Sequence, residues 1–181
     1  MKIRHSHKSD RLEIGQIHKK AFGKVKGQVI AKLVSDLFDD KTAEPLLSLV
    51  AVENQNIMGH ILFTKVNVSQ SPTSVSASIL APLAVHPDIQ ATGVGGLLIK
   101  EGLDQLKKNE VDLVFVLGHP DYYPRSGFTP AGKLGFNAPY PIPEEHAGAW
   151  MVIELSSGII GKVKGTVECS DVLNQPQHWR E

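Results

Sequence analysis

Two segments near the start of the chain place apolar residues at the spacing of an amphipathic helix. The apolar rows share this spacing: Ile14, Ile17 and Ala21 in the first segment, and Val29, Leu33 and Leu37 in the second. Ser9 or Asp10 can cap the first helix, and Asp10 with Glu13 resembles a capping box. The pattern therefore predicts two consecutive helices that each bury one face.

Segments rich in alternating and β-branched residues surround these helices and predict strands. One strand is expected before the helices, at residues 2–5, and three follow them, at residues 47–53, 57–68 and 75–85. The polar segment 69–74 turns the chain into the last of them. Gly59, inside the third strand, indicates a bulge or a close approach of another part of the chain. Strands 47–53, 57–68 and 75–85 predict an antiparallel meander.

The apolar period changes to about four residues over residues 93–109, which predicts a long packed helix. Residues 111–117 are almost wholly apolar, as expected of a strand buried on both faces. The order strand, helix, strand makes this strand parallel to strand 75–85, with a right-handed crossover. A last central strand is expected over 149–155, and an edge strand near 163–167. The sheet is therefore mixed, and the fold class is α/β.

Composition limits both the number of domains and the classes of partner. A chain of 181 residues suffices for one compact domain. Lys plus Arg and Asp plus Glu number 19 each, so the net charge of zero argues against nucleic acid as a partner. The single cysteine, Cys169, predicts a reducing, cytoplasmic environment. Since no apolar run approaches about 20 residues, neither a membrane span nor a secretion signal is expected.

A glycine-rich turn between a strand and a helix is the most informative segment. Gly93, Gly95 and Gly96 lack a Cβ, so several backbone N–H groups can converge on an anion at the helix N-terminus. A pyrophosphate fits such a turn, and the alternative is that the glycines only allow close packing. Leu97 follows them where a P-loop needs Lys and Ser or Thr. A dinucleotide-binding fold is disfavoured because the next strand ends without an acidic residue.

Pro82 lies within strand 75–85, which is expected to be central, although proline has no N–H for strand pairing. Its presence indicates a bulge or a place where pairing with the neighbouring strand lapses. A gap beside the unpaired backbone groups of residues 83–85 could accept an extended ligand that carries amides, and pantetheine is such a ligand. The alternative is that Pro82 marks only a kink.

Two motifs resemble those of a known family, the GCN5-related N-acetyltransferases (GNAT). Residues 90–95, Gln-Ala-Thr-Gly-Val-Gly, match its acyl-CoA pyrophosphate motif, Gln/Arg-x-x-Gly-x-Gly/Ala. Segment 116–128 is similar to its second signature, Tyr-x-x-x-Gly-Phe, with Tyr123 in the tyrosine position. More narrowly, both regions resemble the YhbS-like group, which often has glycine in place of Ala91 and an aromatic residue in place of Ser126.

The resemblance implies a GNAT fold over residues 1–155, with 156–181 as a C-terminal extension, and acetyl-CoA as co-substrate. This fold has a mixed, mostly antiparallel sheet with one parallel strand-helix-strand unit and flanking helices. In the family, the strand before the pyrophosphate motif ends in a bulge, and the pantetheine lies in the V between that strand and the next. Co-substrate contacts are therefore expected on the bulged strand and the turn: Leu83, Ala84, Val85, Gln90, Ala91, Thr92, Gly93, Val94, Gly95 and Gly96.

Acetyl transfer to an amine needs a neutral amine, a donor for the oxyanion and a proton for the departing thiolate, but no enzyme nucleophile. Tyr123 is the candidate donor to the thiolate, and Tyr122 is the second choice. The alternative is that both rings and Phe128 form only an aromatic patch. The backbone N–H of Val85 is the expected oxyanion donor, as the resemblance also implies.

The general base and any metal site are less well defined by the sequence. Strand 75–85 carries no acidic residue, so water may relay the proton unless one of the distant options serves: Glu53, His60, His119 or Glu144. His5 and His7 share a strand face, but two ligands do not make a zinc site. No metal is therefore expected.

These features together predict an N-acetyltransferase that moves the acetyl group of acetyl-CoA to a primary amine of a small molecule or peptide by direct attack. A first rival is a non-catalytic acyl-CoA sensor that regulates a partner. A second rival is a structural interaction module, which predicts no affinity for CoA. A homodimer, with the tail pairing to another subunit, is left open.

Overall fold

A mixed β-sheet forms the middle of the molecule. The computed structural model describes residues 1–71 and 74–180. The strands of this part of the chain are β1 (Lys2–His5), β2 (Leu47–Glu53), β3 (Asn56–Val68), β4 (Ala77–Val85), β5 (Leu113–Leu117), β6 (Thr129–Pro130), β7 (Phe136–Asn137), β8 (Trp150–Glu154) and β9 (Gly165–Glu168). Its α-helices are α1 (Arg11–Phe22), α2 (Lys26–Phe38) and α3 (Val94–Lys108). The sheet order is β1-β2-β3-β4-β5-β8-β6, and β9 pairs with the end of β3 and with β7.

The predicted helices and strands are present, with boundaries shifted by at most two residues. The meander β2-β3-β4 is antiparallel, and β5 runs parallel to β4 after the crossover through α3, as predicted. Gly59 lies next to a register shift between β2 and β3, and a Cβ there would stand 3.0 Å from Leu98 on α3. The turn predicted over 69–74 includes residues 72 and 73, which lie outside the described ranges.

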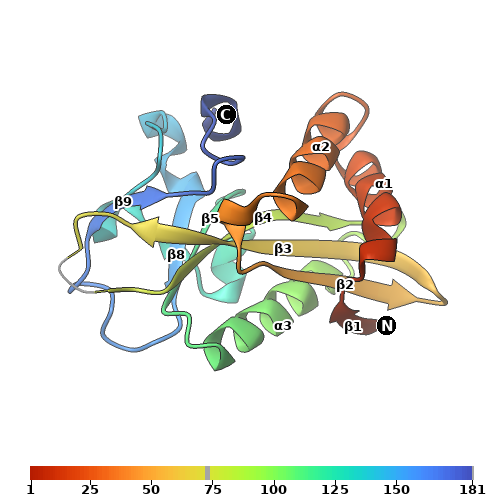
Figure 1. Ribbon diagram of the computed structural model, residues 1–181, viewed down its shortest axis with the longest axis horizontal. Helices are drawn as coiled ribbons and strands as arrows, with labels where there is room; N and C mark the ends of the chain where they lie inside the picture. Colours follow the sequence, from red (N-terminus) through yellow and green to blue (C-terminus); the bar gives the residue numbers. More distant parts are fainter. Residues whose placement is uncertain (72–73, 181) are drawn as a thin grey trace.

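The two faces of the sheet are covered by different helices, and each cover has its own core (Figure 1). Helices α1 and α2 lie on one face, together with the C-terminal segment, and bury residues such as Leu62, Phe115 and Trp150. Helix α3 lies on the other face and buries residues such as Phe63 and Val114. Adjacent strand residues point to opposite faces, so one strand contributes to both cores.

The N-terminus of α1 differs from the predicted capping box. Asp10 does not cap α1 with its side chain, but accepts a hydrogen bond from the N–H of His7 at 2.7 Å and forms an ion pair with Arg4 at 2.8 Å. Glu13 instead accepts the N–H of Ile57 at 2.8 Å. Both carboxylates therefore bond to residues outside α1. These bonds depend on how the elements pack together, which the local spacing of residues does not indicate.

The segment after β8 packs onto the core that α1 and α2 cover. Trp179 is buried, stands edge-on to Trp150 with ring centroids 5.6 Å apart, and donates its indole N–H to the carbonyl of Leu173 at 2.9 Å. Asp40, after α2, accepts the N–H of Val172 at 3.0 Å.

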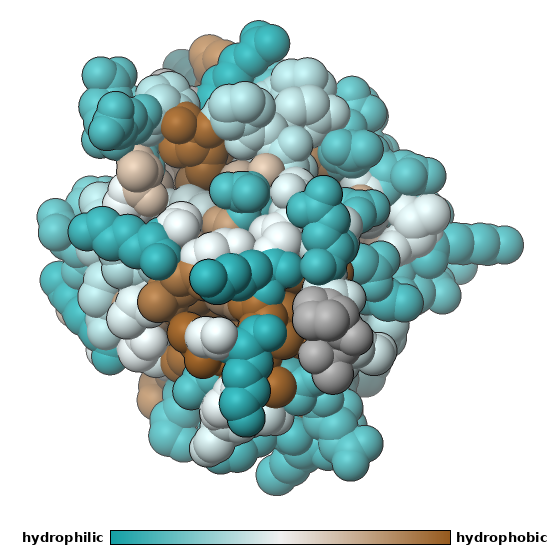
Figure 2. Space-filling model, turned by 90° about the vertical axis from the view of Figure 1, so that its left-hand side faces the viewer, coloured by the Kyte–Doolittle hydropathy of each residue, from teal (hydrophilic) through white to brown (hydrophobic). Residues whose placement is uncertain are grey.

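Figure 2 shows the face formed at the end of β3 and β9, where one group of hydrophobic side chains lies among mostly hydrophilic ones.

A chain of polar side chains crosses the core beneath α1. His18 Nε2 lies 2.8 Å from His60 Nδ1, and His60 Nε2 lies 2.8 Å from the hydroxyl of Ser48. Both imidazoles are fully buried, and His18 Nδ1 has no partner within the described part of the chain. Burial lowers the pKa of His18 to about 4 and also lowers the pKa of His60. Both rings are therefore neutral at pH 7 in the folded protein.

This pair makes folding stability depend on pH. In the unfolded chain each histidine binds a proton near pH 6.5, whereas the folded protein resists protonation until a lower pH. The free energy of unfolding is thus unaffected by protonation of this pair above pH 6.5. It decreases as the pH falls toward 4, by up to about 1.4 kcal/mol per pH unit for each histidine, because the unfolded chain binds the protons first. We expect urea unfolding to show this slope, and His18→Gln to flatten it.

The half-buried His178, whose pKa burial also lowers, supplies the control, because His178→Asn should alter the slope less. Asp10 contributes in a different, more acidic range, because the hydrogen bond from Arg4 holds the pKa of its carboxyl below the usual range. Equal slopes between pH 6.5 and 4.5 in the parent protein and His18→Gln would contradict the assignment.

Candidate active site

Strands β4 and β5 pair only over the first half of β4. Their parallel ladder runs from Ala77 opposite Leu113 to Leu80 opposite Val116 and extends no further along the described strands. On its other side, β4 contains two residues, Ala81 and Pro82, where β3 has one, which is the bulge expected from Pro82. The residues of β4 are buried up to Leu80 and mostly half-buried beyond it. A central strand thus becomes accessible where its neighbour separates from it.

The hydrogen-bond alternation between β3 and β4 fixes which backbone groups face this gap. His86 donates its N–H to the carbonyl of Met58 at 2.8 Å, so these two residues form a hydrogen-bonded pair. Hydrogen-bonded and non-bonded pairs alternate along an antiparallel ladder, so Val85 opposite Gly59 and Leu83 opposite Ile61 are non-bonded. The N–H groups of Leu83 and Val85 therefore point away from β3, toward the gap. The side chain of Gln90 donates to the Val85 carbonyl at 3.0 Å from that same side.

The glycine-rich turn lies directly beyond β4 and begins α3. Gly93, with φ +98°, is the N-cap residue and has no side chain to cap the helix, and the first N–H bonded within the helix is that of Leu97. The N–H groups of residues 94–96 are therefore left to an external acceptor. A Cβ on Gly93 or Gly96 would meet none of the described atoms within 4 Å. This part of the turn faces open space, as an anion site requires.

Gly95 has a different neighbour from the other two glycines. A Cβ on Gly95 would overlap the hydroxyl oxygen of Tyr122 and would stand 3.7 Å from a methyl carbon of Leu83. Close packing therefore explains Gly95. The left-handed backbone explains Gly93, and Gly96 faces open space. The two interpretations of the glycine-rich turn each apply to part of it.

The two adjacent tyrosines stand on different sides of the gap. Tyr122 reaches the start of α3, whereas the ring of Tyr123 packs on the backbone of Gly118, just after β5, with one ring carbon 3.0 Å from the Cβ that glycine lacks. Their rings are perpendicular, with centroids 5.1 Å apart, and Tyr123 is also perpendicular to Phe128 at 5.8 Å. Burial, and then the neighbouring Tyr122, raise the pKa of Tyr123 well above 10. Tyr123 thus keeps its proton and can donate it in a hydrogen bond.

The candidate bases are not gathered around this gap. His60 is buried in the pair with His18, Glu53 lies two strands away on β2, and Glu144 is exposed in the segment before β8. His119 uses Nδ1 to accept the N–H of Asp121 at 3.2 Å. A neutral ring with Nδ1 as acceptor carries its hydrogen on Nε2, so in this geometry neither ring nitrogen has a free lone pair for an incoming amine proton.

Cys169 packs against the core that α1 and α2 cover. Burial raises the pKa of the Cys169 thiol to about 12, so it is not a thiolate at neutral pH. Within residues 1–71 and 74–180, no three His, Cys, Asp or Glu side chains gather in a metal-binding group. The same ranges contain no helix that is both long and apolar enough to span a bilayer.

Comparisons with known proteins place this architecture in a family. The model of the Acetyltransferase (GNAT) domain matches residues 2–131. The chain belongs to the GNAT acetyltransferase family. It is 45% identical over 165 residues to the uncharacterized N-acetyltransferase YjhQ of Escherichia coli K12, covering 91% of this chain and 89% of YjhQ. The YhbS N-acetyltransferase of the same strain is 32% identical over 146 residues, covering 80% and 83%.

Solved structures of GNAT proteins share the fold of this chain. The crystal structure of Escherichia coli YhbS in complex with CoA superposes with a TM-score of 0.85 at 28% identity, covering 96% of this chain and 92% of that one. A GNAT family acetyltransferase from Brucella melitensis in complex with acetyl-CoA gives 0.74 at 27% identity, covering 95% and 97%. The GNAT fold expected from the two motifs is confirmed, with a short 3-10 turn, Tyr123–Ser126, carrying the second motif.

The structure brings most of the predicted residues to one place and adds contacts that the sequence did not indicate. Leu83, Val85 and the turn 90–96 border the gap, and Tyr122 reaches the turn at Gly95. Tyr123 packs on Gly118 at the end of β5, and Ala84 is buried toward α1. The contact between Tyr122 and Gly95 was missed. In the sequence, this contact is indicated only by the presence of Tyr122 beside Tyr123, the tyrosine of the motif. That pattern does not indicate that Tyr122 contacts Gly95.

The overlap between Gly95 and Tyr122 predicts a coupled pair of substitutions. In the parent protein, Gly95→Ala should destabilise by about 1–3 kcal/mol, because the new methyl group overpacks against the hydroxyl. Tyr122→Phe removes that oxygen and leaves the ring carbon that bears it 3.4 Å from the methyl group, an ordinary contact. Gly95→Ala should therefore be neutral or stabilising in the Tyr122→Phe background, since alanine favours helix over glycine.

Thermal or urea unfolding of the four proteins of this cycle measures the coupling. Gly96→Ala is the matched control, because its methyl group meets open space and should not depend on Tyr122. An equal effect of Gly95→Ala in both backgrounds would show that Tyr122 does not occupy this position.

Proposed function

We propose that the chain transfers the acetyl group of acetyl-CoA to a primary amine by direct attack. The observation that carries the proposal is the gap beside β4, which has outward backbone N–H groups at Leu83 and Val85 and unbonded helix N–H groups at residues 94–96. An extended ligand with amides and a diphosphate matches this series of donors. The CoA and acetyl-CoA complexes of its structural relatives support the same ligand.

The reaction exchanges one bond for another without an enzyme nucleophile. The amine nitrogen attacks the thioester carbon, the new N–C bond forms and the C–S bond breaks. The nitrogen loses one proton and the sulfur gains one, so protons balance. Tyr123 is the group proposed to donate a hydrogen bond to the departing sulfur, because its buried hydroxyl stays protonated at the end of β5.

Backbone N–H groups are proposed to stabilise the oxyanion. Val85 and Leu83 both direct an N–H toward the gap, and Leu83 lies nearer the point where β4 and β5 separate. We assign Val85 as oxyanion donor, with Leu83 as the deeper donor of the same row. Backbone donors suit this role because the folded strand holds them in place before the charge develops.

A non-catalytic acyl-CoA sensor is the second candidate function. It shares the binding groups, and the feature that favours the enzyme is Tyr123, whose ring packs on Gly118 at the end of β5 and on Phe128. A cytoplasmic location is a further prediction that rests on the single cysteine. A homodimer also stays a prediction, but the tail gives it no support, because β9 pairs with β3 and β7 of its own chain.

Tyr123→Phe separates the enzyme from the sensor. The substitution keeps the ring that packs on Gly118 and removes only the hydroxyl, so calorimetry should give CoA affinity within about twofold of the parent. Loss of a hydrogen bond to the leaving thiolate should lower kcat by about 10²–10³-fold. Initial rates of CoA thiol release with a panel of amines measure this.

Tyr122→Phe is the matched control: it removes the neighbouring hydroxyl and should leave kcat unchanged if Tyr123 is the donor. A parent protein that binds acetyl-CoA but acetylates no amine would favour the sensor. An unchanged melting temperature in millimolar CoA would contradict both functions.

A further inference from the structure

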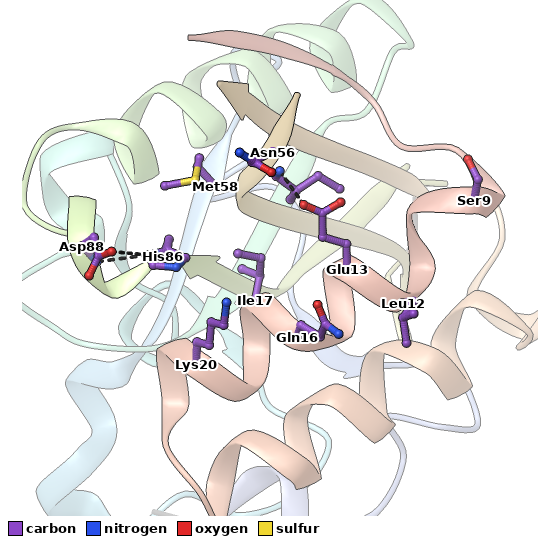
Figure 3. Close-up of a pocket in the computed structure, with 11 residues that line it drawn as sticks. Ser9, Leu12, Glu13, Gln16, Ile17, Lys20, Asn56, Met58, His86 and Asp88 are labelled. Atoms are coloured by element: carbon purple, nitrogen blue, oxygen red, sulfur yellow. Dashed lines mark hydrogen bonds and ion pairs between the residues drawn. The ribbon is translucent and has the colours of Figure 1, made fainter. Parts of the chain in front are cut away.

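An open hollow of about 600 Å³ lies between α1, the start of β3 and the 3-10 turn Pro87–Ile89 (Figure 3). Its wall includes Met58 and Ile17, and also His86, which directly follows Val85 on the strand that borders the gap. Its volume is within the range of small-molecule sites. The hollow is thus on the α1 side of the sheet, beside the end of β4.

A second hollow of about 450 Å³ continues from the first along α1. Lys20 lines both, and the second is otherwise lined by Lys19, Gly23, Lys24 and Gln28 around the connection between α1 and α2. The two hollows share Lys20 and are together called the trough. We use the term trough for these two hollows only.

Charge is distributed unevenly along the trough. Glu13 and Asp88 line the first hollow together with Lys20, whereas the second hollow is lined by Lys19, Lys20 and Lys24 and by no acidic residue of the described chain. Within the described residues, none of these three lysines has an ion-pair partner, although Lys32 and Lys100 pair with nearby aspartates. Uncompensated charge of one sign in a concave surface attracts ligands of the opposite sign.

Helix geometry sets the distance between the two charged parts. Glu13 and Lys20 are two turns apart on α1, so they share a face and are separated by about 10 Å along the axis. Glu13 uses Oε1 to accept the N–H of Ile57, which holds its carboxylate at the start of β3. Figure 3 shows Lys20 extending from the same face toward His86.

We infer that the acceptor is a small amine that also carries a carboxylate or phosphate group. This inference rests on the proposed acetyl transfer and names the class of its second substrate. The amine lies in the first hollow, beside His86 at the end of β4, and the anionic group lies at Lys20 and the two neighbouring lysines of the second hollow. Lys20 is the specificity-determining residue, because it borders both hollows.

Matched pairs of amines test the inference. Acetyl-CoA consumption is measured with phosphoethanolamine against ethanolamine, and with β-alanine against propylamine. We expect kcat/KM to be at least about tenfold higher for the anionic member of each pair. This preference should decrease between 50 mM and 500 mM salt, because the lysines are exposed and screened.

Substitutions of Lys20 locate the preference. Lys20→Gln should raise KM for the acceptors with an anionic group about tenfold and leave KM for their partners without that group unchanged, since it removes one charge-assisted contact. Lys20→Glu should reverse the preference. Lys108→Gln, an exposed lysine at the far end of α3, is the control and should change neither acceptor.

The outcomes separate the two proposals. Acetylation of uncharged or cationic amines at the same rate as anionic ones, or an equal effect of Lys20→Gln on both members of a pair, would overturn the acceptor class alone. No thiol release with any amine, together with no CoA binding, would overturn acetyl transfer and the acceptor class with it.

Discussion

The end of pairing between β4 and β5 is the constraint on which the site depends. Backbone donors inside a sheet are normally used by the neighbouring strand, and a buried donor without a partner is costly. The pairing of β4 with β5 ends at Leu80 and Val116. The N–H groups of Leu83 and Val85 are therefore directed into a gap and not into a ladder. The bulge at Pro82 fits this separation, because proline gives no N–H to either neighbour. The gap is therefore built by the sheet itself and needs no mobile element to create it.

The other side of the gap depends on the turn that carries the two tyrosines. Their perpendicular rings link β5 to α3, since Tyr123 packs on Gly118 while Tyr122 reaches Gly95. The absence of a Cβ at both glycines is what permits these contacts. One glycine of the pyrophosphate motif thus serves packing, while its neighbours leave the helix N-terminus open. This division explains why the glycine pattern alone could not decide between an anion site and close packing.

Local patterns were enough to predict the strands, the helices and the bulge, because each depends on neighbours in the sequence. Pro82 in an otherwise apolar strand is informative since its missing N–H has the same consequence in any sheet. The pairing of His18 with His60, the ion pair of Asp10 with Arg4 and the contact of Tyr122 with Gly95 could not be predicted in this way. Each joins residues whose proximity is set by the packing of separate elements. His60 was an option for the base by residue type, and only its burial beside α1 removes it from the gap.

The distribution of titratable groups favours a reaction in which the enzyme supplies position and hydrogen bonds more than proton transfer. His60 is occupied by His18 and Ser48, and the Nδ1 atoms of His86 and His119 accept backbone N–H groups. The buried thiol of Cys169 is protonated at neutral pH. An amine that reaches the thioester in its neutral form needs none of these groups as a base, because solvent can take the proton it releases. The requirement that remains is a donor for the oxyanion and one for the sulfur, and these are the roles proposed for the strand N–H groups that face the gap and for the protonated Tyr123 at the end of β5.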